Sequence, residues 1–121
     1  MSTLRVNTLQ DATGSNQPAM VGAAKAWVNF NGSGTVAIRE SFNVSSITDN
    51  GVGLFTLNFT NALVDGSYVV AGSSGNNTGG TSTARSLHRY GEWTTTECAI
   101  RVATINNTNT DDEYIGVSIH R

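Results

Sequence analysis

Apolar and polar residues alternate along most of the chain between residues 24 and 120. The clearest alternating sets are Ala26, Val28 and Phe30, then Phe55, Leu57 and Phe59, then Ile115, Val117 and Ile119. A period of two is typical of a β-strand with one buried face. The pattern predicts that each set points into the core and that Trp27 points the other way, into a second apolar layer or against a neighbouring subunit.

Short segments rich in Gly, Asn and Asp separate the alternating stretches. Strands are expected near residues 24–30, 35–40, 42–48, 53–60, 67–73, 84–90, 96–105 and 113–120. No stretch of helical periodicity links them, which argues against an α/β fold. The spacing predicts an all-β fold, an antiparallel β-sandwich or jelly-roll-like domain over residues 23–121. Residues 72–83 are small and polar, and they predict a mobile surface loop.

Residues 1–22 differ from the rest of the chain. Leu4, Val6 and Leu9 form a short alternating segment, and residues 11–18 are turn and loop types. A lone strand must pair with the domain, with another copy or with a different protein, and the alternative is a frayed terminus. Because the core strands are expected to start later, removal of residues 2–17 should leave a folded β-rich domain.

Composition narrows the classes of function. Charged residues make up 13% of the chain and the net charge is −2, with the basic residues scattered, so nucleic-acid binding is not expected. No apolar stretch is long enough for membrane insertion or a secretion signal. Cys98 is the only cysteine, and its place in an alternating run predicts a small core side chain.

Catalytic chemistry finds little support in the residues. His88 and His120 do not stand at metal-ligand spacing, and Cys98 lacks the context of a nucleophile. The acidic run at residues 111–113 lacks the pattern of a calcium loop and is expected to be a solvated turn. Carboxylates paired only in space stay open. We expect no enzyme activity, no catalytic residues, no metal and no cofactor.

The segment from His88 to Trp93 is the best candidate for ligand contact. It gathers an imidazole, a guanidinium and two aromatic rings at His88, Arg89, Tyr90 and Trp93. Aromatic faces and polar groups suit a sugar or peptide surface. The alternative is structural, with Tyr90 and Trp93 capping the edge of the sandwich and the Arg89 stem covering apolar surface.

Two segments resemble a known family. Residues 24–59, beginning AKAWVNFNGSG and continuing through SFNVSSITDNG, together with the opening STLRVNTLQD, resemble virion structural proteins of bacteriophages, tail-fibre-like proteins above all, notably of phages that infect cyanobacteria and other marine bacteria. The resemblance implies a virion protein that is assembled in the host cytoplasm. It also implies that residues 1–22 form an attachment arm, with Leu4, Val6 and Leu9 binding other virion proteins.

Two functions follow from the resemblance. The first is a fibre or spike-type appendage that is a homotrimer, with Trp27 at its interface, and contacts a bacterial surface glycan. The alternative is a decoration or cement protein that stabilises the capsid or tail. The arm distinguishes them, because a decoration protein needs it ordered against a virion partner.

Overall fold

A computed structural model describes residues 3, 23–76 and 84–121 of the chain. Its eight strands are β1 (Ala24–Asn31), β2 (Ala37–Phe42), β3 (Val44–Gly51), β4 (Leu54–Phe59), β5 (Val69–Gly75), β6 (Arg85–Trp93), β7 (Glu97–Thr104) and β8 (Tyr114–His120). The expected arm, including Leu4, Val6 and Leu9, lies outside the described residues. Residues 72–75, which were expected in a loop, instead complete β5, because they continue its ladder with β8.

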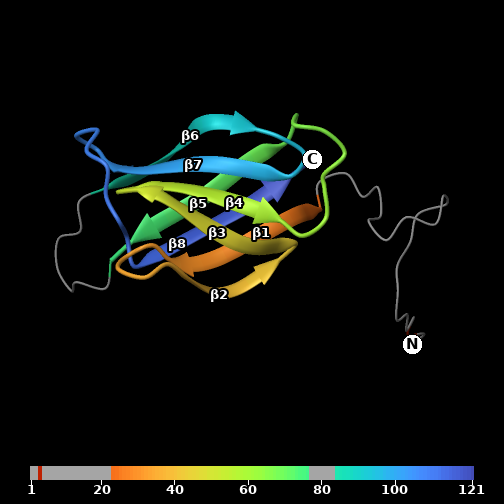
Figure 1. Ribbon diagram of the computed structural model, residues 1–121, viewed down its shortest axis with the longest axis horizontal. Coiled ribbons are helices and arrows are strands. Elements are labelled where there is room, and N and C mark those ends of the chain that lie inside the picture. Colours follow the sequence, from red (N-terminus) through yellow and green to blue (C-terminus); the bar gives the residue numbers. More distant parts are fainter. Residues whose placement is uncertain (1–2, 4–22, 77–83) are drawn as a thin grey trace.

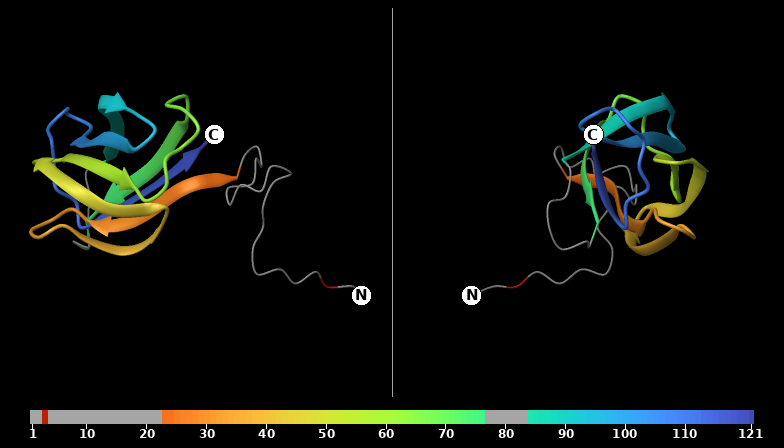
Figure 2. Two further views of the ribbon diagram at one scale, coloured as in Figure 1. Left: turned by 45° about the vertical axis from the view of Figure 1, so that its right-hand side comes forward. Right: turned by 90° about the vertical axis from the view of Figure 1, so that its left-hand side faces the viewer.

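The strands form two antiparallel sheets that pack face to face, as Figures 1 and 2 show. Sheet A has the order β2-β1-β8-β5, and sheet B has the order β3-β4-β7-β6. The predicted all-β sandwich is therefore confirmed. The edge strands are β2 and β5 in sheet A and β3 and β6 in sheet B.

The three alternating sets fill the space between the sheets. All nine side chains are buried, and the Phe30 and Phe55 rings meet edge to face at a centroid distance of 5.2 Å. Such aromatic contacts add to the stabilisation from burial. Cys98 is fully buried among them, which confirms its expected place in the core.

Asn43 makes the corner where the chain passes from sheet A to sheet B. Its φ of 57° is left-handed, a conformation that Asn tolerates better than most residues. Its side-chain amide donates to the backbone oxygens of Lys25 and Asn61, and its Oδ1 accepts from the Asn61 N–H at 2.7 Å. These bonds hold the end of β2 against the start of β1 and the end of β4.

Both ends of the folded part lie at the same end of the sandwich. Ala24, which begins β1, pairs with His120 near the end of β8, and Figure 1 shows the start of β1 and the C-terminus at this end. Here Arg121 makes two hydrogen bonds of 2.8 Å to the Asp65 carboxylate, and they hold the pKa of Asp65 at about 2. We call this the terminal end and the opposite one the far end.

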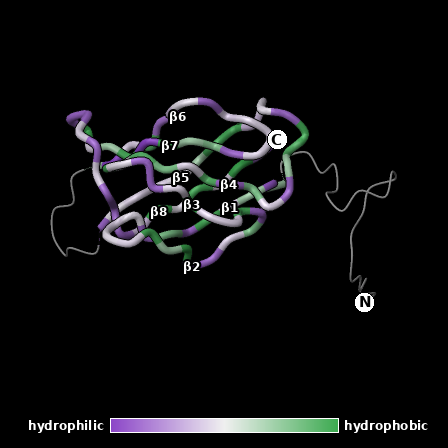
Figure 3. Tube along the Cα trace, viewed as in Figure 1, coloured by the Kyte–Doolittle hydropathy of each residue, from purple (hydrophilic) through white to green (hydrophobic). Residues whose placement is uncertain are grey.

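At the far end, the acidic run is not the solvated turn that was expected. Asp112 is fully buried, and both of its carboxylate oxygens accept hydrogen bonds from Nε of Arg85, at 3.0 and 2.9 Å. The Asp112 carbonyl accepts from Gly32, and the Asp111 side chain accepts from the Gly53 N–H. The run therefore ties both sheets together, beside a loop after β7 that Figure 3 colours as hydrophilic.

Burial makes Cys98 a test of core integrity. Loss of solvation raises the pKa of its thiol to about 12 from 9.0, so the neutral thiol persists in the folded state. The unfolded chain ionises near its ordinary pKa, so this group's stabilising effect is complete below pH 9 and declines as the pH rises toward 12. We expect stability to fall by roughly 1.4 kcal/mol per pH unit in that window.

Urea titrations at pH 8 to 11, compared with those of Cys98→Ala, isolate this contribution of the thiol. An equal decline in both proteins would show that Cys98 is not its source. A maleimide should label Cys98 only when the chain unfolds.

Candidate functional site

The outer face of sheet A carries a concentration of exposed hydrophobic side chains. Eight large hydrophobic residues are exposed within the described parts of the chain. Four lie on this face, which are Trp27, Phe42, Val69 and Tyr114. The others are Tyr90 on β6 and three residues in connections between strands. An exposed apolar surface of this kind is typical of an interaction site.

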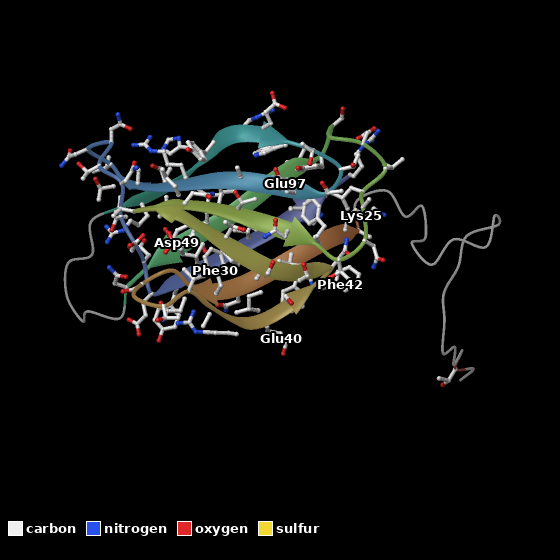
Figure 4. The ribbon with its side chains drawn as sticks, viewed as in Figure 1. Lys25, Phe30, Glu40, Phe42, Asp49 and Glu97 are labelled. Atoms are coloured by element: carbon white, nitrogen blue, oxygen red, sulfur yellow. The ribbon has the colours of Figure 1, made fainter. Side chains whose placement is uncertain are left out.

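Trp27 and Phe42 stand side by side on this face, and we call the pair the aromatic ridge. They are directly paired across β1 and β2, so their side chains project on the same side of the sheet. Trp27 is 37% exposed and Phe42 is 52% exposed. The prediction that Trp27 points away from the core is confirmed. Figure 4 labels Phe42 and Glu40 along β2.

Arg39 lies across the middle of the same face. A register shift in the β1–β2 pairing makes it an extra residue between Ile38 and Glu40. Its guanidinium lies 4.3 Å from the centroid of the Tyr114 ring on β8 and donates to the Glu113 carbonyl at 2.7 Å. Arg39 thus crosses β1 and binds to both ends of the β8 approach, which fixes its charge beside the ridge.

Small residues occupy the rest of the face. Ala71, Ser73 and Gly75 alternate outward on β5, and Gly116 and Ser118 do so on β8. We call these five residues the small-residue strip. A Cβ atom added at Gly75 or Gly116 would meet no atom within 4 Å, so the surface there is open.

The four candidate contact residues on β6 do not form one cluster. Alternation places His88 and Tyr90 on the outer face of sheet B, where the His88 ring lies 2.8 Å from the Ser86 hydroxyl. Arg89 and Trp93 face the other way, with the guanidinium 4.7 Å from the centroid of the indole ring. The sequence segment is therefore split between two surfaces.

Trp93 belongs to the edge of the core. Its ring stacks on Tyr68 at a centroid distance of 5.4 Å, and its Nε1 donates to the Ala99 carbonyl at 2.8 Å. The bond forms where β6 leaves its regular register with β7. Trp93 and Arg89 thus occupy the structural positions of the alternative interpretation, whereas His88 and Tyr90 are exposed side chains.

Sequence reasoning found Trp27 but missed Phe42, Val69, Tyr114 and Arg39 on the same face. Phe42 was expected to begin the third strand, although it ends β2, so its pairing with Trp27 could not be foreseen. The alternation of Tyr114 with Ile115 does carry a usable signal, since one is buried and the other exposed. The position of Arg39 depends on a bulge that no sequence pattern marks.

Other chemistry is little represented in the described parts. Across residues 23–76 and 84–121, no three His, Cys, Asp or Glu side chains gather to hold a metal ion. Those residues also include no helix that is long and apolar enough to cross a membrane. The outer face of sheet A is the surface with the clearest functional character.

Comparison with protein-family models, with curated proteins and with solved structures gives no match for this chain.

Proposed function

We propose that this protein is a non-enzymatic structural subunit of a bacteriophage virion, of the fibre or spike type, which assembles through the outer face of sheet A. The observation that supports assembly is the gathering of Trp27, Phe42, Val69 and Tyr114 on that face. The resemblance of residues 24–59 and of the N-terminal segment to phage virion proteins supports the virion role.

The proposed assembly is a homotrimer. Homo-oligomers mostly close into symmetric rings, and tail-fibre-like proteins, which the chain resembles, are usually trimers. Packing of sheet A against neighbouring copies would remove the aromatic ridge from water. It would leave the outer face of sheet B, with His88 and Tyr90, exposed on the assembled particle. These two side chains are the proposed contacts for a bacterial surface glycan, because an aromatic face and a polar ring suit a sugar.

Trp27→Asp is expected to dissociate the oligomer. Burial of an unpaired carboxylate in the interface would cost several kcal/mol at each site. The measurement is sedimentation velocity at micromolar concentration. Tyr90→Asp is the matched control, since Tyr90 is 40% exposed but lies on sheet B, and it should leave the sedimentation coefficient unchanged. A monomeric wild-type protein, or equal dissociation by both variants, would contradict the proposed assembly.

Location on the particle tests the virion role. Antibodies against the folded domain, viewed with phage particles by electron microscopy, should label a tail or spike appendage. Labelling spread over the capsid would favour the decoration function. Particles that carry no label would contradict both.

A further inference from the structure

We propose that the aromatic ridge of one copy seats on the small-residue strip of a neighbouring copy. This inference rests on the proposed assembly through sheet A and specifies which parts of that face meet. The ridge is Trp27 and Phe42, and the strip is Ala71, Ser73, Gly75, Gly116 and Ser118.

The face has a high side and a low side. One row of paired residues crosses sheet A in the order Phe42, Trp27, Ser118 and Ala71. Two large rings are followed by two small side chains in the same row. The neighbouring row ends at Gly116 and Ser73, where the surface is lower still because Gly116 has no side chain. Strands about 4.8 Å apart put the centres of the two sides about 10 Å from each other.

The strip is bounded by larger side chains. Val69 and His120 pair at the terminal end of β5 and β8, and Tyr114 pairs with Gly75 at the far end. Val69 is 66% exposed and Tyr114 is 43% exposed, so both stand above the small residues between them. A ring placed on Gly116 and Ser73 would contact apolar side chains at both ends.

Strand β5 also differs from the other three edge strands. Strand β2 contains Arg39 and Glu40, and β3 and β6 both contain charged residues and shifts of register. Charges and bulges are the devices that keep edge strands from pairing with other chains. Strand β5 pairs with β8 in unbroken register and has no charged residue or proline. This side of sheet A therefore carries no protection against contact.

A second copy of this chain is the occupant that fits both halves. Each copy presents a ridge that needs a low apolar surface and a strip that needs bulky apolar side chains. The strip itself contains no charged residue, so covering it with aromatic rings removes no charge from water. Ridge-to-strip contact places different parts of the face against each other, as in a head-to-tail ring, and it avoids stacking one ridge on another.

Ser73→Trp tests the inference, because it fills the strip from an exposed position on β5. We expect the dissociation constant of the oligomer to rise about 100-fold, from loss of close packing at the centre of the interface. Thr48→Trp is the matched control, with an indole added to the outer face of edge strand β3 in sheet B. It should associate as the wild type does. Circular dichroism checks that both variants keep the fold.

Mixing two variants tests which surfaces meet. A ridge variant, Trp27→Ser with Phe42→Ser, and the strip variant Ser73→Trp should each be monomeric alone. Mixed together, they should form complexes that contain both chains, because the intact strip of one meets the intact ridge of the other. Native mass spectrometry resolves these mixed species by mass.

The outcomes separate this inference from the proposed assembly. If the wild type is monomeric, assembly through sheet A fails and the inference fails with it. If the wild type associates and Trp27→Asp dissociates it while Ser73→Trp does not, the assembly stands and the strip is not its partner surface. Absence of mixed complexes would likewise overturn the pairing of ridge with strip.

Discussion

Asp112→Ala is expected to lower the free energy of unfolding by about 3–5 kcal/mol. The Asp112 carboxylate is fully buried and accepts two hydrogen bonds from Nε of Arg85, whose side chain is itself only 13% exposed. Its removal leaves a guanidinium with little access to water and no carboxylate to balance it. Urea unfolding at neutral pH, followed by tryptophan fluorescence, measures the loss.

The exposed pair of Asp65 and Arg121 provides the control. Its geometry is as good, with two hydrogen bonds of 2.8 Å, but both side chains are more than 40% exposed. Water replaces the lost partner there, so Asp65→Ala should leave the urea midpoint almost unchanged at neutral pH. If Asp65→Ala destabilised the domain as much as Asp112→Ala, burial would not be the source of the effect.

Gly53→Ala is expected to cost about 3 kcal/mol or more, because backbone strain and a steric clash coincide there. Its φ is +69°, and an added Cβ would overlap the Val102 carbonyl oxygen and approach the Thr110 nitrogen at 2.9 Å. The residue cannot move away easily. Its N–H donates to Asp111 and its carbonyl accepts from Val102 at 2.7 Å.

Gly34→Ala separates the two causes. Gly34 has a φ of +65°, nearly the same, but a Cβ there would meet no atom within 4 Å. This variant should show only the cost of the backbone conformation, about 1 kcal/mol. Thermal unfolding of the two variants measures the difference. Equal losses would mean that the contact with Val102 relaxes without cost.

The sequence predicts the strands and their buried faces because these depend on a local pattern. The set of Phe55, Leu57 and Phe59 specifies a strand, its period and its inward face without knowledge of its neighbours. Residues 72–75 show the limit of such reasoning. Their small polar side chains have little strand preference, and they join β5 only because β8 supplies a ladder.

The candidate surface was harder to predict, because it depends on pairings between distant residues. Asp112 finds Arg85 27 positions earlier in the chain, which turns an apparent surface run into a buried tie. Phe42 reaches Trp27 across a strand pair whose register shifts at Arg39. His88 and Trp93 lie close in sequence yet face opposite ways, because β6 bends out of register between Arg89 and Trp93.

The pairing of β1 with β8 determines the order in which this chain can fold. The hairpins β1–β2, β3–β4 and β6–β7 close between neighbouring strands and can form early. Sheet A acquires its centre only when Ala24 and its neighbours meet residues near His120, almost the whole length of the domain later. Contacts this distant in sequence slow folding to milliseconds or seconds. During synthesis, therefore, the first strand waits for the last, and the β1–β2 hairpin exposes its apolar inner face until β8 has left the ribosome.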